Sequence, residues 1–204
     1  MLGSILVLSG PSGCGKSSLV GEILKEYDDI YFSISTTTRD MREGECDGVD
    51  YHYISKELFE EEIQEGLFLE WAKVHDNYYG TSLKAVQKAL LEGKLVIFDI
   101  DVQGHEIVKE KFDDILTSLF ITTPSAEILR DRLLKRGTDS QDIIERRLSN
   151  SREEMNRIDE YDFLLVNDNF EETLEKFRFI VGAARMKIDK KSKDNFINTW
   201  YNNL

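Results

Sequence analysis

The chain has 204 residues, 41% of them hydrophobic and 32% charged, which is typical of a folded globular protein rather than a disordered one. Its net charge of −13 argues against broad binding to nucleic acid, because that requires a basic surface. No apolar run approaches the roughly 20 residues of a membrane span, and the N-terminus predicts a strand rather than a signal peptide. Two cysteines, Cys14 and Cys46, provide neither a disulfide framework nor a metal site, so we expect a reducing, cytoplasmic location.

The N-terminal segment predicts a strand, a glycine-rich turn and a helix. Residues 5–8 form a short apolar run typical of a strand buried on both faces. Residues 10–18, GPSGCGKSS, match the spacing G-x-x-x-x-G-K-[ST] of loops that bind nucleotide phosphates. Apolar residues then recur at helical spacing, so we expect a helix that starts near Lys16. Such a unit directs backbone N–H groups and the positive helix end toward one anion. The alternative, a turn that binds nothing, is the weaker interpretation because strand and helix both flank the loop.

The segment after the first helix is long enough to have a structure of its own. We predict a second strand at 30–35 and a fully apolar strand at 95–100, which leaves about sixty residues between them. The elements predicted in that interval are an arginine- and glycine-bearing loop at 36–48, a short helix capped by Ser55, a strand at 67–74, and a helix after Gly80 closed by Gly93. We therefore interpret 36–94 as a small mixed insert over the phosphate loop.

The rest of the chain continues to alternate strands and helices. The predicted elements are a helix at 104–111, a strand at 116–122, a helix from Ser125 to Gly137, a charged helix at 139–159, a buried strand at 164–166 and an amphipathic helix at 170–184. For the tail after residue 187 we make no definite assignment. The fold class expected is α/β, with a parallel-sheet core that binds a nucleoside triphosphate, an inserted mixed α+β subdomain and a helical lid. We assign 1–35, 95–124 and 160–204 to the core, 36–94 to the insert and 125–159 to the lid.

Three residues near the predicted loop suit phosphoryl transfer. Lys16 can reach the β- and γ-phosphates of a triphosphate, and the Ser17 hydroxyl can bind Mg²⁺. Asp99 ends an apolar strand, where the acidic residue that helps to hold the metal is expected. Capping of the next turn is the alternative role for Asp99. A GTPase remains a candidate because Asp101–Gly104 fits a D-x-x-G turn, but the chain contains no N-K-x-D segment.

Two groups of arginines provide candidate anion sites. Arg39 and Arg42 open the insert, which also contains Tyr51 and Tyr79, and guanidinium and phenol groups suit a phosphate monoester.

Arg132 and Arg136 lie one helical turn apart, and Arg146 and Arg147 follow in the charged helix. A charged helical hairpin of this kind could close over a transferring phosphate and exclude water. Ordinary surface arginines are the alternative for both groups.

Segments along nearly the whole chain, up to about residue 185, resemble the guanylate kinases in order and spacing. They are GPSGCGKSSL at 10–19, FSISTTTRDMREGECDGVDY at 32–51, FLEWAKVHDNYYGTS at 68–82, FDIDVQG at 98–104, RLLKRGTDSQDIIERRLS at 132–149 and VND at 166–168. The resemblance implies reversible, Mg²⁺-dependent transfer of a phosphoryl group from ATP to GMP, and to dGMP. Small-molecule partners are expected, with no nucleic acid and no membrane, and the oligomeric state is left open.

The resemblance also implies roles for individual residues. For ATP it implies the loop Gly10, Pro11, Ser12, Gly13, Cys14, Gly15, Lys16, Ser17 and Ser18, with Asn167 near the adenine and Ser17 and Asp99 at the metal. For the guanine edge it implies Ser35, Glu70 and Thr81, with Asp101 close by, and for the GMP phosphate it implies Arg39, Arg42, Tyr51 and Tyr79, with Glu45 in the same loop. For catalysis it implies Lys16 and the lid arginines Arg132, Arg136 and Arg147.

Two positions depart from the family pattern, and one alternative function remains. Met41 stands where proline is common, and Cys14 stands where threonine or alanine is usual. We expect the Cys14 thiol to be open to alkylation unless ATP covers it.

The alternative function is a guanylate-kinase-like protein-interaction module without catalysis. The intact phosphate loop and arginines argue against that alternative.

Overall fold

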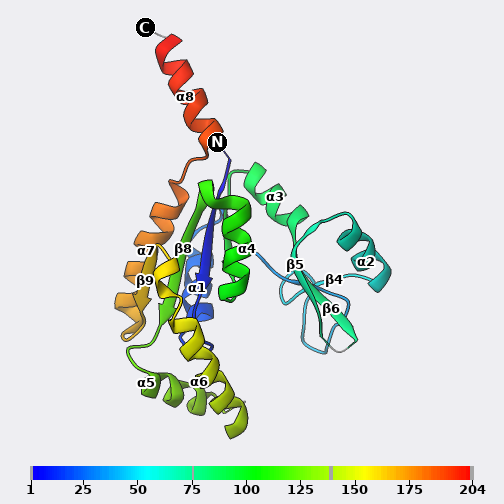
Figure 1. The fold of residues 1–204 in the computed structure, drawn as a ribbon, viewed down its shortest axis with the longest axis vertical. Helices are drawn as coiled ribbons and strands as arrows, with labels where there is room; N and C mark the ends of the chain where they lie inside the picture. Colours follow the sequence, from blue (N-terminus) through cyan, green and yellow to red (C-terminus); the bar gives the residue numbers. More distant parts are fainter. Residues whose placement is uncertain (1, 75, 138–139, 203–204) are drawn as a thin grey trace.

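The computed structural model describes residues 2–74, 76–137 and 140–202, and its main sheet has five parallel strands (Figure 1). The strands lie in the order β2-β7-β1-β8-β9. Their bounds are β1 Ser4–Ser9, β2 Ile30–Phe32, β7 Leu95–Asp99, β8 Leu116–Thr122 and β9 Phe163–Val166. Because β1 is central and its neighbours extend to either side, the carboxyl end of β1 is the expected position of a ligand site. The predicted α/β class is confirmed.

Helices cover both faces of this sheet. One face packs against α1 (Lys16–Glu26) and α7 (Phe170–Arg185), and the other packs against α3 (Leu83–Leu91) and α4 (Val102–Phe112). Side chains of a strand alternate between faces, so Leu6 joins the first cluster and Ile5 joins the second. The apolar run of the first strand is therefore explained by burial on both sides.

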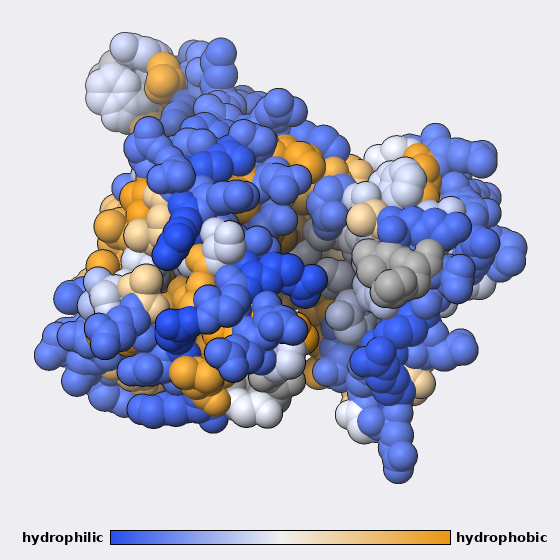
Figure 2. Space-filling model, turned by 60° about the horizontal axis from the view of Figure 1, so that its bottom comes forward, coloured by the Kyte–Doolittle hydropathy of each residue, from blue (hydrophilic) through white to orange (hydrophobic). Residues whose placement is uncertain are grey.

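A second sheet lies within residues 36–82, in the order β4-β3-β6-β5. Its elements are β3 Thr36–Thr37, β4 His52–Tyr53, α2 Lys56–Gln64, β5 Phe68–Val74 and β6 Asn77–Ser82. Helix α2 packs on it through Phe59, whose buried ring stacks on Phe68 and Tyr78. In Figure 2 this part of the chain forms a lobe beside the body, and hydrophilic side chains cover most of both.

Strand β6 was not predicted from the sequence. Its residues, NYYGTS, are largely polar, and Gly80 in their midst suggested a break before the next helix. The glycine instead permits close contact between β5 and β6, since a side chain at Gly80 would come within 2.8 Å of the Glu70 carbonyl oxygen. Strand β6 also pairs on its other side with β3, where Thr36 lies opposite Gly80, and that contact is not local in the sequence.

Helices α5 (Ala126–Arg136) and α6 (Gln141–Met155) lie beyond the carboxyl ends of the main strands (Figure 1). Ser125 caps α5 by accepting a hydrogen bond from the Ile128 amide, and α5 ends at Gly137 with φ of 65°. Leu129 and Leu133 of α5 pack with Ile144 of α6 in a small apolar cluster of their own. Short 3₁₀ turns at Asp113–Ile115 and Ile158–Glu160 precede β8 and β9.

Two features of the C-terminal part differ from expectation. The strand predicted as buried is β9, in which Leu165 is buried but Leu164 is 50% exposed. The prediction of a buried strand was wrong because β9 is the edge strand of the described sheet, next to β8. The tail forms a separate helix, α8 (Lys190–Asn202), which extends away from the body and has no buried residue (Figure 1).

The strand predicted at 30–35 is also shorter than expected. Strand β2 ends at Phe32, and the chain then passes to the second sheet at Thr36.

None of the described helices is both long and apolar enough to cross a membrane.

Two phenylalanines of α7, one buried and one exposed, allow a test of how much core packing stabilises the fold. Phe177 is fully buried among α1, α7 and the main sheet, whereas Phe179 of the same helix is 71% exposed. We expect Phe177→Ala to lower the free energy of unfolding by about 3–5 kcal/mol, because it leaves a cavity. The matched control Phe179→Ala should change it by less than about 0.5 kcal/mol. Urea denaturation followed by circular dichroism measures both, and equal losses would contradict the packing.

Candidate functional site

The loop Gly10–Ser18 leaves the carboxyl end of β1 and leads directly into α1. Gly10 has φ of 135°, and a side chain there would collide with the Ile121 carbonyl oxygen of β8. Gly15 has φ of 102°, and a side chain there would collide with the Asn167 amide. Both positions therefore favour glycine for conformation, and Gly10 also requires it for space, because the atom it would meet is backbone. The turn ends in the first residues of α1, whose unpaired N–H groups can bind an anion.

Lys16 lies at the mouth of this loop. Its ammonium group donates a hydrogen bond to the Gly10 carbonyl oxygen at 2.6 Å, and it is 3.7 Å from the Asp99 carboxylate at the end of β7. Burial raises the pKa of the Asp99 carboxyl, and the Lys16 ammonium opposes that rise. The lysine is thus held in place by a carbonyl and a carboxylate before any ligand binds.

A pocket of about 620 Å³ opens around these groups. The residues lining it come from the loop, from the segment after β7 and from the two helices beyond the sheet: Gly10, Ser12, Gly13, Gly15, Lys16, Ser17, Ser18, Asp99, Ile100, Asp101, Arg132 and Glu154. Most of the predicted ATP-binding residues are therefore brought together. The pocket combines backbone N–H donors and cations with three carboxylates, a set suited to phosphates and a metal ion together.

The donors in the pocket fit Mg²⁺. Ser17 and Asp99 provide a hydroxyl and a carboxylate oxygen, which are ligands that hard cations prefer. Among the described residues, no group of three or more His, Cys, Asp or Glu side chains could hold a metal by itself. This agrees with the usual mode for Mg²⁺, which binds one or two protein ligands together with substrate phosphates and water.

Two of the three predicted lid arginines reach the loop. The Arg132 guanidinium in α5 donates to the Asn167 carbonyl oxygen at 2.8 Å and to the Cys14 carbonyl oxygen at 3.4 Å. Arg147 in α6 donates to the Ser12 hydroxyl. Arg136 lies at the end of α5, and its side chain falls outside the described part of the structure. Helices α5 and α6 therefore both contribute cations to the phosphate loop.

Asn167 lies against the loop rather than in open solvent. Its side-chain amide donates to the Cys14 carbonyl oxygen at 2.7 Å, and the residue is buried. This contact connects the residue after β9 to the turn after β1. Asn167 thereby helps to fix the loop in the position that the predicted nucleotide site requires.

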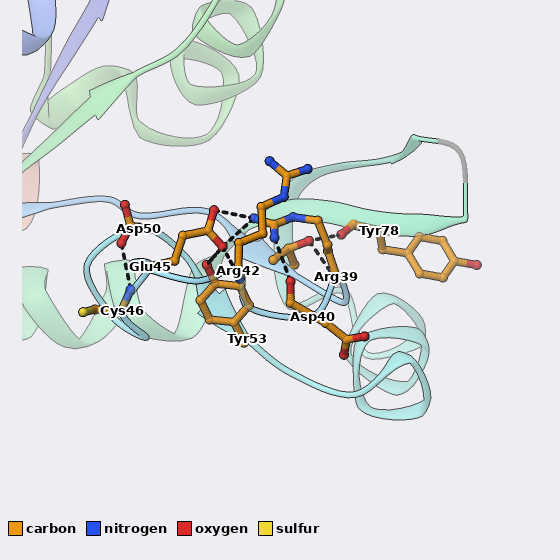
Figure 3. A network of polar contacts seen from close by, with 9 residues as sticks. Arg39, Asp40, Arg42, Glu45, Cys46, Asp50, Tyr53 and Tyr78 are labelled. Atoms are coloured by element: carbon orange, nitrogen blue, oxygen red, sulfur yellow. Dashed lines mark hydrogen bonds and ion pairs between the residues drawn. The ribbon is translucent and has the colours of Figure 1, made fainter.

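A polar network in the loop between β3 and β4 is built around Glu45 (Figure 3). One Arg39 guanidinium nitrogen donates to both Glu45 oxygens, at 2.8 and 3.0 Å, and the Tyr53 hydroxyl donates to the same carboxylate at 2.8 Å. The Arg42 backbone N–H donates to it at 2.7 Å. The Arg39 hydrogen bonds, followed by the Arg42 amide, lower the pKa of Glu45 to about 2. The carboxylate therefore stays ionised and orients the Arg39 guanidinium.

The two predicted tyrosines gather beside this network. The rings of Tyr51 and Tyr79 meet edge to face, with centroids 5.9 Å apart, and Arg39 lies 5.5 Å from the Tyr51 ring centre. The Arg42 guanidinium points away from Glu45 in Figure 3. The structure thus brings Arg39, Tyr51 and Tyr79 together, and it leaves the Arg42 side chain exposed nearby.

The residues predicted to read guanine lie where β5 and β6 pair. The Thr81 hydroxyl donates to the Glu70 carboxylate at 2.6 Å. Thr36 of β3 pairs with Gly80 of the antiparallel strand β6. Ser35, just before Thr36, is therefore next to Thr81, just after Gly80. Asp101 is elsewhere: it caps α4 by accepting hydrogen bonds from the Gln103 and Gly104 amides, and it lines the phosphate pocket.

Two site residues were missed in the sequence. Tyr53 orients Glu45. It could have been found, because residues two apart in an extended segment share a face, and Tyr53 therefore lies beside Tyr51. Glu154 lines the phosphate pocket from α6, two helical turns after Arg147. Burial raises the pKa of Glu154, the Lys16 ammonium lowers it and the Asp101 carboxylate raises it.

The expectation of an accessible Cys14 thiol was wrong. The side chain is fully buried in the cluster between the sheet, α1 and α7, and burial raises the pKa of the thiol. Reactive thiols are exposed and have a lowered pKa, so alkylation of the folded chain at Cys14 is disfavoured. The loop contributes the backbone of this residue to the site and its side chain to the core.

Comparison with known proteins agrees with this geometry. The guanylate kinase family model matches residues 3–184. A guanylate kinase from Sulfurimonas denitrificans is 54% identical over 198 residues, covering 97% of this chain and 96% of its own length. One from Campylobacter jejuni is 47% identical over 201 residues, covering 98% of each. A crystal structure of guanylate kinase from Anaplasma phagocytophilum matches with a TM-score of 0.67 and 32% identity, covering 91% of this chain and 88% of that one. The chain belongs to the guanylate kinase family, as its sequence predicted.

Proposed function

We propose that this chain performs the guanylate kinase reaction, ATP + GMP to ADP + GDP and its reverse, with a division of roles between its two sheets. The observation that carries the proposal is the presence of two separate sets of anion-binding groups. One is the phosphate loop with Lys16, and the other is the arginine–tyrosine group around Arg39. Full-length identity of about half to the bacterial guanylate kinases supports the same assignment. Its partners on this proposal are small nucleotides rather than nucleic acid or membranes.

The main sheet holds ATP in this proposal. Backbone N–H groups from Gly10 to Ser18 hold the phosphates, and Lys16 contacts the β- and γ-phosphates. Ser17 and Asp99 would hold Mg²⁺, which neutralises charge on the phosphates when it is bound. The Asn167 and Arg132 side chains donate hydrogen bonds to the Cys14 carbonyl oxygen of the loop, and the nucleotide base lies near Asn167.

The second sheet holds GMP. The Glu70 carboxylate, held by the Thr81 hydroxyl, accepts hydrogen bonds from guanine N1–H and the 2-amino group, while the Ser35 hydroxyl donates to the oxygen at position 6. Adenine lacks that pair of donors, so Glu70 would be left desolvated and unpaired beside it. The GMP phosphate binds to a cluster of two arginines and two tyrosines through charge-assisted hydrogen bonds: Arg39, Arg42, Tyr51 and Tyr79. Glu45 orients this cluster. The choice of these residues rests on the resemblance to the family.

The chemical step needs positioning and charge neutralisation rather than a general base. An oxygen of the GMP phosphate is already anionic at neutral pH, so it attacks the γ-phosphorus directly as ADP leaves on the opposite side. Lys16 and the arginines of α5 and α6, Arg132, Arg136 and Arg147, stabilise charge on the group in transfer. Helices α5 and α6 also exclude water, which limits hydrolysis of ATP.

A coupled assay of ADP formation tests the proposal with GMP, dGMP, AMP, CMP, dTMP and no acceptor. We expect kcat/KM for GMP to exceed that for AMP by on the order of 10⁴-fold, because a hydrogen-bonding site rejects an analogue without its donors. Equal rates with AMP would refute the guanine assignment. Rapid turnover without any acceptor would identify a simple ATPase instead.

Replacing Lys16 tests the phosphate loop. We expect Lys16→Met to lower kcat by on the order of 10³-fold, because one positive charge on the transferring group is lost. The matched control is Lys25→Met, which removes an exposed lysine of the same helix that pairs with Glu22. Circular dichroism confirms folding of both, and undiminished turnover by folded Lys16→Met would refute this role.

Replacing Glu70 tests the guanine site. Glu70→Gln should lower kcat/KM for GMP by about 10- to 100-fold, because the amide pairs with guanine through one acceptor and brings an unwanted donor. The affinity for ATP, measured by calorimetry without GMP, should stay unchanged. Glu65→Gln, an exposed position at the end of α2, makes the same charge change as a control. Full activity of Glu70→Gln with unaltered rejection of AMP would contradict the assignment.

A further inference from the structure

Glu154 is a carboxylate in the phosphate pocket to which the proposed reaction gives no role. It is half-buried near the end of α6 and lines the same pocket as Lys16, Ser17 and Asp99. The other groups around the pocket belong to the phosphate loop, the end of β7 or α5. Glu154 is therefore the acidic group that α6 adds to the site.

The geometry of α6 directs Glu154 toward the loop. Arg147 and Glu154 are seven residues apart, so they lie two turns apart on the same side of the helix. Arg147 donates a hydrogen bond to the Ser12 hydroxyl, which fixes that side against the phosphate loop. The adjacent side of α6 packs through Ile144 onto α5. One helix thus presents a cation and an anion to the same pocket.

The surroundings of Glu154 lack a direct partner for its charge. In the described part of the chain its carboxylate forms no side-chain hydrogen bond and no ion pair, and the charges that act on it are the Lys16 ammonium and the Asp101 carboxylate. The Lys16 ammonium offsets part of the cost of burying this carboxylate, and the Asp101 carboxylate adds to that cost. The position therefore suits a further cation.

The three pocket carboxylates constrain how such a cation is bound. Asp99, Asp101 and Glu154 line one pocket, yet no group of three acidic side chains among the described residues is close enough to coordinate one ion directly. Mg²⁺ normally keeps several water molecules when it binds phosphates. A carboxylate slightly too distant to ligate can accept hydrogen bonds from those waters and orient them.

We propose that Glu154 is a metal-positioning residue, which accepts hydrogen bonds from water molecules bound to Mg²⁺ of the ATP complex. This inference rests on the proposed function, because it assumes that the pocket holds Mg²⁺ and ATP phosphates. Through Glu154 and Arg147, α6 contacts both the metal's water shell and the phosphate loop. The helix that supplies an arginine for the transferring group thereby also helps to place the metal.

The test measures metal binding directly. Mn²⁺, a paramagnetic substitute for Mg²⁺, is titrated by electron paramagnetic resonance into the enzyme saturated with a non-hydrolysable ATP analogue. We expect Glu154→Gln to weaken Mn²⁺ binding by on the order of tenfold, the usual loss when an outer-sphere partner is removed. Glu153→Gln, which changes the exposed neighbour on the same helix, should bind Mn²⁺ like the unmodified chain. Glu154→Asp, which keeps the charge, should recover part of the affinity.

Two outcomes would overturn the inference. Unchanged Mn²⁺ affinity in Glu154→Gln is the first. The second is an equal loss of affinity for the ATP analogue measured in EDTA, since Glu154 would then act on the loop or Lys16 rather than on the metal. Thermal unfolding checks that each variant is folded, and Glu154→Asp provides the comparison if Glu154→Gln is not. The titration needs neither GMP nor turnover, so a failure of the guanine assignment in the acceptor assay would leave its result readable.

Discussion

The close approach of the phosphate loop to its neighbours is the constraint on which the rest of the site depends. At Gly10 the backbone lies against the Ile121 carbonyl of β8, and at Gly15 it lies against the Asn167 side chain after β9. A side chain at Gly10 would displace the turn and with it the start of α1, and one at Gly15 would strain the backbone and push the Asn167 side chain aside. The hydrogen bond from Asn167 to the Cys14 carbonyl holds the same turn from the other side. The main sheet thus determines the position of the loop at which we propose that phosphates bind.

An acidic protein that binds two anionic substrates must concentrate positive charge locally. With a net charge of −13, the chain does so by holding each site cation in a defined position. Lys16 donates to the Gly10 carbonyl, Arg132 donates to the Asn167 carbonyl, and Arg39 donates to the Glu45 carboxylate. Such prior orientation lowers the reorganisation needed when a phosphate arrives. The cost is that a ligand must share or replace these contacts, most clearly at Arg39, whose partner Glu45 is ionised.

Sequence reasoning predicted the parts of the fold that local patterns determine. The apolar run of β1, the glycine spacing of the loop and the helical caps at Ser55 and Ser125 are all short-range signals. It missed β6 and misjudged β9, because pairing of β6 with β3 and position at the sheet edge depend on distant parts of the chain. The family resemblance named most of the candidate site residues, but it did not include Glu154 or Tyr53. Their roles depend on how α6 and the loop before β4 are placed.

The two halves of the acceptor site are supported in different ways. Glu70 follows Leu69 in β5, and Leu69 is buried in the apolar cluster that α3 and α4 form with the main sheet. Glu70 therefore directly follows a residue anchored in the body, at the point where the register of β5 and β6 shifts. Arg39, in contrast, is oriented by Glu45 and lies over the half-buried rings of Tyr51 and Tyr53. Glu70, proposed to bind guanine, is consequently placed next to the core of the protein, whereas Arg39, proposed to bind phosphate, is placed by a polar network within the second sheet.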